Sequence, residues 1–292
     1  MKNKALIFLI VLLSLITLSL IGLMTIVIKN KTIFNINGFT QRIEELQIDE
    51  SYKNTFNEIN IKTDAADIEI KTSENEDIYL KIYSEKNYAK AINKETELNI
   101  EVNQKKCGVF CINNKISKVE LYIPENYEKE ITIKNNYGDI KIDSFKNLNL
   151  NIEEDAGGIN LEKANIVDIK NNCGDIKINE INKGTINEST GDIEINKVNN
   201  INIKNNYGDT KINEINEYLK IDADAGDVKI NTLNITKNSN IEINAGDIKI
   251  NQTNDIYIDA TTDLGETKIN NNNDKAEITL KIENNLGDIK VN

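Results

Sequence analysis

The stretch ITIKNNYGDIKIDSF, Ile131 to Phe145, recurs in recognisable form to the last residue of this chain of 292 amino acids. One glycine marks the phase of each copy, and the copies follow one another at steps of 19, 17, 17, 17, 18, 20, 19 and 22 residues. The marker glycines are Gly138, Gly157, Gly174, Gly191, Gly208, Gly226, Gly246, Gly265 and Gly287. Units this short cannot bury an apolar face alone, so the repetition predicts a solenoid whose stacked coils share one core.

Within a copy, apolar and polar residues alternate on both sides of the glycine. Ile131 and Ile133 precede Gly138, and Ile140 and Ile142 follow it. Alternation at a period of two places these isoleucines on one face of an extended strand and the polar residues on the other. We therefore expect an all-β fold, a parallel β-solenoid with about 17–20 residues in each two-strand coil.

The glycine is expected at a corner between two strands, where a positive φ is often needed and a Cβ would clash. Asparagines crowd the same corner, at positions 135, 136, 171, 172, 205, 206, 284 and 285. Because asparagine tolerates left-handed geometry and bonds to nearby backbone, stacked asparagines are expected to satisfy turn groups from coil to coil. The alternative is that they only reflect the general abundance of asparagine in the chain.

The N-terminal segment has the character of a membrane anchor. Residues 1–31 contain no acidic residue, and the 24 residues from Ala5 to Ile28 contain no charge. At a helical rise of ~1.5 Å per residue, this length crosses the ~30 Å hydrocarbon layer of a bilayer. We expect a cytoplasmic N-terminus at 1–4, a transmembrane signal anchor at 5–28 and an extracytoplasmic C-terminal domain. A cleaved signal peptide is the alternative, although its apolar region would be shorter and end near a small-residue cleavage site.

The remaining chain divides by the regularity of the repeat. Residues 29–53 form a connector, residues 54–130 are expected to form longer and less regular coils, and residues 131–292 form the regular GDIxI coils. The first coil places Ala66 in the position of the marker glycine, with Ile59 and Ile61 before it. The solenoid is therefore predicted to begin before the glycines do.

Several of these features together resemble a known family. They are the uncharged anchor, a first coil ADIEI at Ala66–Ile70, a strand ending YIPEN at Tyr122–Asn126, and repeated NxxGDIxI units. They are similar to a bacterial "putative adhesin" family of β-strand-repeat domains of unknown function, which includes LiaG-like membrane proteins. The resemblance covers about residues 57–292. It implies a β-solenoid held at the cell envelope, linked to envelope stress in some members, and it supplies no catalytic residues.

The charge of the chain argues against some partners. Lys2, Lys4, Lys29 and Lys31 account for four of the 35 basic residues, and all 47 acidic residues come later, so residues 32–292 carry a formal charge of −16. Nucleic acid binding depends on neutralising phosphates with lysine and arginine, so a nucleic acid partner is not expected. Docking on an anionic lipid surface is disfavoured for the same reason.

The three cysteines leave alternatives open. Cys107 and Cys111 flank the sequence GVF, and Cys173 takes a turn position that Tyr137 and Tyr207 hold in sister copies. Outside the cytoplasm, a Cys107–Cys111 disulfide is compatible with this spacing, and free thiols are the alternative. A zinc site is poorly supported because the chain has no histidine and no second close cysteine pair.

An acidic residue follows most of the marker glycines, and a lysine follows two residues later. The acidic row is Asp139, Asp175, Asp192, Asp209, Asp227, Asp247 and Asp288, with Glu266 standing in once. The basic row is Lys141, Lys177, Lys211, Lys229, Lys249, Lys268 and Lys290, interrupted by Glu194. One hypothesis is a calcium ladder on the aspartates. The other is a pair of adjacent ladders of opposite charge that screen each other without an ion, and it is favoured because the glycine-rich nonapeptide of calcium-binding rolls is absent.

Catalysis is not expected, although some β-solenoids are polysaccharide-cleaving enzymes. The chain has no histidine, no tryptophan and a single arginine, Arg42, which lies in the connector. Every candidate acid or base repeats with the coil, so no catalytic constellation and no cofactor site stands out. The tyrosines at 137, 207, 218 and 257 would form either a sugar-stacking strip or covers over the core.

The sequence therefore predicts a membrane-anchored, non-catalytic adhesion or binding module of the cell envelope, directed at a wall polymer or an envelope protein. The alternative is a structural or regulatory component of envelope stress that acts through protein partners. The final strand, LGDIKVN at Leu286–Asn292, has no obvious polar cap. It is expected to form an edge through which the chain self-associates.

Overall fold

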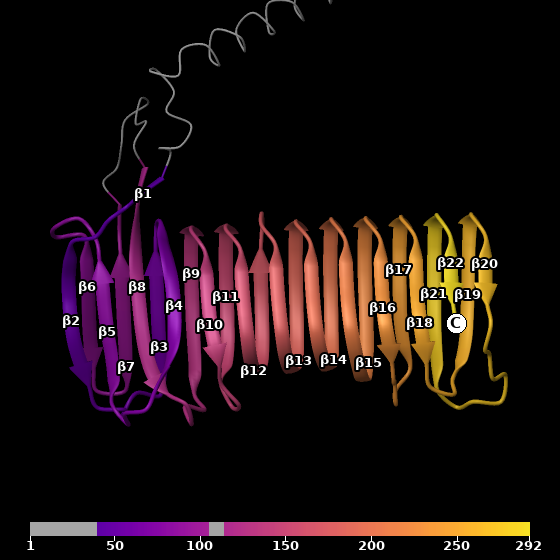
Figure 1. Ribbon diagram of the computed structural model, residues 1–292, viewed down its shortest axis with the longest axis horizontal. Helices are drawn as coiled ribbons and strands as arrows, with labels where there is room; N and C mark the ends of the chain where they lie inside the picture. Colours follow the sequence, from indigo (N-terminus) through magenta and orange to yellow (C-terminus); the bar gives the residue numbers. More distant parts are fainter. Residues whose placement is uncertain (1–39, 105–113) are drawn as a thin grey trace, which may run out of the picture. The chain divides into compact units, whose positions relative to one another are not determined.

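The computed structural model describes residues 40–104 and 114–292, and in these ranges the chain consists of strands joined by turns. The strands wind into a β-solenoid whose coils stack side by side (Figure 1). The all-β, solenoid prediction is thus confirmed. The described part contains no helix of the length and apolar character that a membrane crossing requires. The predicted anchor at 5–28, residues 29–39 of the connector, and Cys107 and Cys111 lie outside the described residues.

The irregular N-terminal part contains eight strands: β1 (Thr40–Arg42), β2 (Leu46–Tyr52), β3 (Glu58–Thr63), β4 (Ala66–Ser73), β5 (Ile78–Tyr83), β6 (Ala89–Lys94), β7 (Glu97–Val102) and β8 (Asn114–Pro124). The regular coils contain β9 (Glu130–Tyr137), β10 (Ile140–Ser144), β11 (Asn149–Ala156), β12 (Ile159–Asn171), β13 (Ile176–Thr190), β14 (Ile193–Tyr207), β15 (Thr210–Ala225) and β16 (Val228–Leu233). The last coils contain β17 (Ser239–Ala245), β18 (Ile248–Thr253), β19 (Tyr257–Leu264), β20 (Thr267–Ile269), β21 (Thr279–Leu286) and β22 (Ile289–Val291).

Each coil contributes one strand before its marker glycine and one after it, and we call the two resulting layers the pre-glycine sheet and the post-glycine sheet. In the middle of the solenoid, the strand after one glycine continues without a break into the strand before the next. The first part of β13 thus pairs in the post-glycine sheet, with Ile176 opposite Ile159, and its second part pairs in the pre-glycine sheet, with Ile186 opposite Ile169. The glycine corner is therefore the sharp turn of the coil, and the second corner is a bend within a strand.

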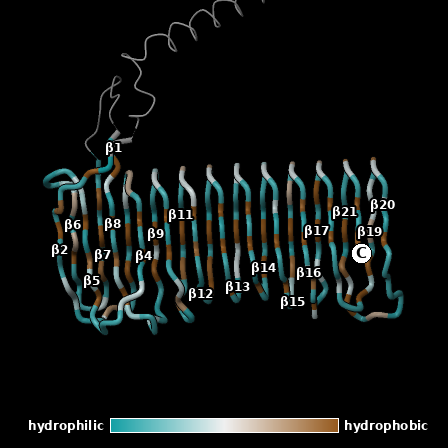
Figure 2. Tube along the Cα trace, in the orientation of Figure 1, coloured by the Kyte–Doolittle hydropathy of each residue, from teal (hydrophilic) through white to brown (hydrophobic). Residues whose placement is uncertain are grey.

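The core consists of columns of apolar side chains at equivalent positions of successive coils. One column in the post-glycine sheet runs through Ile142, Leu161, Ile178, Ile195 and Ile212, all buried and in parallel register. Figure 2 shows these apolar bands repeating in the strands, with hydrophilic residues at the turns. The period-two pattern of the sequence thus sets which residues fill the core.

At the C-terminal end, the order of the coils in space differs from their order in the chain. Strand β21 lies between β17 and β19, and β22 lies between β18 and β20 (Figure 1). The prediction that Leu286–Asn292 forms an edge for self-association is therefore wrong, because both edges of this strand are already paired. The outermost coil is instead the earlier one, made of β19 and β20. A repeat pattern specifies which positions stack, but it does not specify which copy is the neighbour.

The N-terminal end shows the same reversal and adds antiparallel strands. The coil of β3 and β4 lies between the coil of β7 and β8 on one side and that of β9 and β10 on the other. Strand β5 pairs antiparallel with β8 and with β2, and β6 pairs antiparallel with β7. The prediction of a parallel solenoid thus holds for the coils themselves, while β2, β5 and β6 cover the end with antiparallel pairs.

Candidate binding face

The marker glycines lie where adjacent coils approach most closely. A Cβ atom at Gly174 would lie 2.1 Å from the carbonyl oxygen of Gly157, and one at Gly157 would lie 1.9 Å from that of Gly138. Gly174 also has a φ of 138°, a conformation that side chains disfavour. Positive φ recurs at the corner glycines 138, 191, 208, 226, 246, 265 and 287. The corner thus requires glycine both for its backbone angle and for the contact between coils.

The aspartates of the acidic row hold the corners of neighbouring coils together. Oδ1 of Asp175 accepts a hydrogen bond from the backbone N–H of Asp192 at 3.1 Å, and Oδ1 of Asp192 accepts one from Asp209 at 2.9 Å. The same bond recurs from Asp227 to Asp209, Asp247 to Asp227, Asp288 to Asp247 and Glu266 to Asp288, and Oδ1 of Asp139 accepts from Gly158. Backbone donors therefore offset the repulsion between carboxylates. Among the described residues, no group of three acidic, histidine or cysteine side chains is placed to hold a metal ion.

The lysine row lies beside the aspartates on the outer surface of the post-glycine sheet and is exposed. In the described part of the chain, Lys211 is the member of this row that forms an ion pair, with 3.9 Å between its Nζ and Oδ2 of Asp209. The aspartate and lysine rows thus lie side by side as expected, but most of their members do not form ion pairs. The other lysines of the row form no ion pair in this part of the chain, so their ammonium groups are open to solvent or to a ligand.

A row of asparagines runs parallel to the lysines, two residues further along each strand, and sequence reasoning missed it. Nδ2 of Asn196 donates to Oδ1 of Asn179 at 3.0 Å, and Nδ2 of Asn213 donates to Oδ1 of Asn196 at 3.1 Å. Asn231 and Asn251 continue the row, each with a bond of 2.9 Å. A carboxamide has two N–H groups and two acceptor positions, so each asparagine inside the row retains one donor and one acceptor position.

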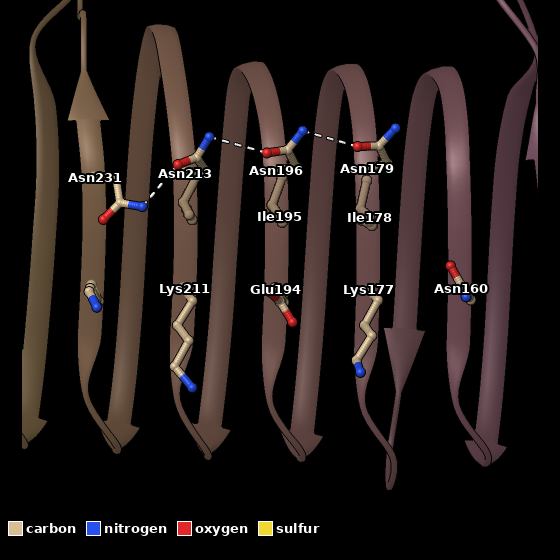
Figure 3. Close-up of a pocket in the computed structure, with 12 residues that line it drawn as sticks. Asn160, Lys177, Ile178, Asn179, Glu194, Ile195, Asn196, Lys211, Asn213 and Asn231 are labelled. Atoms are coloured by element: carbon tan, nitrogen blue, oxygen red, sulfur yellow. Dashed lines mark hydrogen bonds between the residues drawn. The ribbon is translucent and has the colours of Figure 1, made fainter.

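A shallow trough of about 390 Å³ lies between the lysine row and the asparagine row. Figure 3 shows the side chains of Lys177 and Lys211 directed away from the asparagines, which leaves the strands between the two rows uncovered. The trough crosses successive coils from Asn160 to Asn231, and Glu194 is the carboxylate on its lining. Since stacked strands lie ~4.8 Å apart, an asparagine carboxamide recurs at about this interval along the trough.

A second asparagine column lies inside the solenoid, three residues before four of the marker glycines. Asn171 donates through Nδ2 to the carbonyl oxygens of Gly174 at 3.0 Å and Gly157 at 3.5 Å, and Asn205 donates in the same way to Gly208 and Gly191. Asn135 and Asn284 occupy equivalent positions. The expectation that asparagines satisfy turn groups from coil to coil is thus confirmed for these four.

Two glutamates alternate with the asparagines of this interior column, which sequence reasoning overlooked. Glu154 stacks between Asn135 and Asn171, and Glu188 stacks between Asn171 and Asn205. Both side chains are 2% exposed. The signal was present in the sequence as a polar residue at a position whose neighbours face the core.

Burial perturbs the acidity of both glutamates. Loss of solvation raises the pKa of Glu154 to about 8, against the opposing effect of hydrogen bonds from Asn135 and from the backbone N–H of Ala156. Loss of solvation likewise raises the pKa of Glu188 to about 7, although the backbone N–H of Thr190 bonds to its carboxyl group. The ionised form is disfavoured because no cation compensates for the lost water.

The tyrosines do not form a continuous strip. Tyr137 and Tyr207 hold the same corner position and are both 60% exposed, but Ala156, Cys173 and Thr190 lie between them in the stack. The other two, Tyr218 and Tyr257, belong to β15 and β19 at positions away from this corner. Cys173 is an exposed free thiol. A sugar-stacking surface is therefore not assembled from these side chains.

The fold and its outer rows define a β-solenoid repeat protein with a polar, laddered face. The sequence matches the Toastrack DUF4097 model over residues 56–186 and 179–292, and the chain belongs to this family. The match confirms the predicted membership of a β-repeat family of unknown function. No curated protein matches the chain.

Several solved structures are similar to this chain, and three of them are described in turn. A putative adhesin from Bacteroides fragilis shares 16% identity, with 86% of this chain and 99% of that chain covered and a TM-score of 0.44. A putative lipid binding protein from Parabacteroides distasonis shares 13% identity, with 86% and 100% covered and a TM-score of 0.44. A putative adhesin from Parabacteroides merdae shares 13% identity, with 86% and 99% covered and a TM-score of 0.36.

Proposed function

We propose that this chain is a non-catalytic binding module of the cell envelope, and that its trough holds an extended, polar polymer such as a cell-wall glycan. The observation that carries the proposal is the trough between the lysine and asparagine rows, which presents an asparagine carboxamide on each coil from Asn179 to Asn231 beside a row of lysines that only Glu194 interrupts. A shallow trough with regularly spaced polar groups matches a polymer that is itself built from repeating units. Its hydroxyl and amide groups would meet a new carboxamide at each step along the solenoid.

The energetics favour a long ligand over a small one. A single exposed carboxamide or ammonium group contributes little, because water competes for it. A polymer that contacts several coils at once makes the later contacts intramolecular, so that weak contacts combine into useful affinity. The open lysines add attraction for carboxylate or phosphate substituents, while the neighbouring aspartates limit non-specific binding of polyanions.

The chemistry of the trough favours binding over cleavage. Glycoside hydrolysis generally uses two carboxyl groups that flank the scissile bond. The lining of the trough contains a single carboxylate, Glu194, and its remaining charged groups are lysines. The two carboxyl groups whose pKa is raised, those of Glu154 and Glu188, are buried in the interior column and do not line the trough.

The location at the envelope rests on the N-terminal segment. The 24 uncharged residues from Ala5 to Ile28 support a membrane anchor, and the basic residues before them support a cytoplasmic N-terminus. In this arrangement the solenoid lies outside the membrane, within reach of wall polymers.

Co-sedimentation of the full-length protein, solubilised in a mild detergent, with insoluble cell-wall sacculi tests the proposal. We expect the protein to sediment with the sacculi and the trough variant Lys211→Gln/Lys229→Gln to lose most of this binding. The charge-matched control is Lys204→Gln/Lys220→Gln, on the outer surface of the pre-glycine sheet, which should bind like the unmodified protein. Equal loss in both variants, or no sedimentation at all, would contradict the proposal. Absence of sedimentation would instead favour a regulatory role through protein partners.

A further inference from the structure

From Glu154 to Asn205, the interior column contains four buried oxygen atoms without a hydrogen-bond partner: Oε2 of Glu154, Oδ1 of Asn171, Oε2 of Glu188 and Oδ1 of Asn205. They form two pairs of stacked neighbours, because Glu154 is in register with Asn171 and Glu188 with Asn205. An ionised carboxylate and an amide oxygen both only accept hydrogen bonds. Each pair therefore lacks one hydrogen atom.

The first step of the same column shows how such a pair is satisfied. Thr63 is in register with Asn135, and its hydroxyl donates to Oδ1 of Asn135. Thr63 occupies, relative to Asn135, the position that Glu154 occupies relative to Asn171 and that Glu188 occupies relative to Asn205. An O–H group on the preceding coil is thus the observed donor to the asparagine oxygen in this column.

We propose that Glu154 and Glu188 are protonated in the folded protein and that their carboxyl O–H groups donate to Oδ1 of Asn171 and Asn205, so that two stored protons complete the interior column. All four unpaired oxygens are then used in two O–H···O bonds. The other oxygen of each carboxyl group already accepts a backbone N–H, from Ala156 at 3.2 Å and from Thr190 at 3.0 Å. The proposal goes beyond polymer binding, since it concerns what holds the coils together.

The surroundings of both groups favour the neutral form. The charged groups that act on Glu154 are Asp139 and Asp155, and the one that acts on Glu188 is Asp175; all are acidic and oppose a further negative charge. The remaining contacts of the two carboxyl groups are neutral, namely asparagine side chains and backbone N–H groups. Burial acts in the same direction.

The last asparagine of the column shows what happens without a donor. Asn284 lies between Ile243, which has no O–H group, and Thr262, whose hydroxyl donates to the carbonyl oxygen of Gly287, and Oδ1 of Asn284 has no partner. At positions 223 and 243 the column contains apolar residues, so no acidic side chain lies next to Asn284. The protonated pairs are thus confined to the coils from Glu154 to Asn205.

The proposal makes folding sensitive to pH in a defined direction. In the unfolded chain a glutamate loses its proton near pH 4.5, whereas in the folded chain Glu188 and Glu154 keep theirs to about pH 7 and pH 8. Between these limits the unfolded state releases protons that the folded state retains, so the stability of the folded state falls as the pH rises. Below the lower limit both states hold the protons and this contribution is constant.

Urea denaturation of the full-length protein in detergent, followed by circular dichroism at pH 5, 6, 7 and 8, tests this inference. We expect the midpoint of the unmodified protein to fall steadily from pH 5 to pH 8. In Glu154→Gln/Glu188→Gln, amide N–H groups replace the two carboxyl O–H groups, so its midpoint should be nearly independent of pH and exceed that of the unmodified protein at pH 8.

The half-buried neighbour Glu153, which pairs with Lys134, supplies the control, because Glu153→Gln leaves the interior column intact and should retain the fall from pH 5 to pH 8. The inference is overturned if the unmodified protein has a flat or rising midpoint over this range. It is also overturned if the double glutamine variant is less stable than the unmodified protein at pH 8, as a bound cation on ionised carboxylates would require.

Discussion

Asparagine forms ladders in two regions of this solenoid, and the two ladders have different consequences. In the interior column, Asn171 and Asn205 each donate to the carbonyl oxygens of two successive glycine corners. On the outer surface of the post-glycine sheet, Asn196 and Asn213 donate only to the next asparagine and remain exposed. The interior ladder fixes how coils stack, whereas the outer ladder leaves polar groups available to a ligand.

The difference follows from solvent access. A buried carbonyl oxygen that loses its donor pays the full cost of desolvation, so interior asparagines are held by the fold. An exposed carboxamide can exchange its partner for water or a sugar hydroxyl at little cost. One residue type in one repeat can therefore stabilise the fold at one position and serve binding at another.

The largest effect is expected at the corner on which the interior column depends. Gly157→Ala would place a Cβ 1.9 Å from the carbonyl oxygen of Gly138 and push two coils apart, at a cost of about 3 kcal/mol or more. Its neighbour provides the control, since a Cβ at Gly158 meets its nearest atom, Oδ1 of Asp139, at 3.5 Å. Gly158→Ala should change the free energy of unfolding by less than about 0.5 kcal/mol. Equal urea midpoints for the two variants would refute the close contact between corners.

A smaller difference is expected between the two ladders themselves. Asn205→Ala removes the donor to Gly191 and Gly208 in the buried column and should cost about 2–3 kcal/mol. Asn213→Ala removes the equivalent side chain from the outer row, where water replaces it, and should cost less than about 1 kcal/mol. Urea denaturation at pH 6 measures both. Similar losses would remove the distinction between a structural and a binding ladder.

Much of the fold could be predicted from the sequence because each repeat carries its own register. The alternation around Gly138 identified Ile131, Ile133, Ile140 and Ile142 as core residues, and all four are buried. The same alternation placed Ala66 where later coils have glycine, and Ile68 does pair with Ile140. These assignments depend only on period and spacing, which the sequence contains in full.

The order of the terminal coils could not be predicted, because equivalent repeats compete for the same neighbours. Nothing in LGDIKVN indicates that it lies between β18 and β20, since GETKI at residues 265–269 offers the same stacking positions. The asparagine row of the trough was hidden for a different reason. Asparagine is frequent throughout this chain, so its recurrence at 179, 196, 213 and 231 did not stand out until the coils were seen in register.

Sequence reasoning missed the interior glutamates because it aligned the repeat copies of this chain only by their apolar residues. Glu154 and Glu188 occupy the place of Asn135 in their own copies, a polar position that the comparison of apolar residues did not include. Their burial becomes evident only when the neighbouring coils cover them on both sides. A polar residue that alternates with asparagine at an inward-facing position is therefore a signal worth testing in other solenoids.

The most direct test of the account is a titration of the two buried carboxyl groups by carbon-13 NMR. The full-length protein in detergent would be labelled at the glutamate side-chain carboxyl carbons, and Glu154→Gln and Glu188→Gln would assign the two signals. We expect both carboxyl groups to be protonated at pH 6, with midpoints of about 8 for Glu154 and about 7 for Glu188. Midpoints below pH 5 for both, like those of exposed glutamates, would show ionised carboxylates in the column and contradict this expectation.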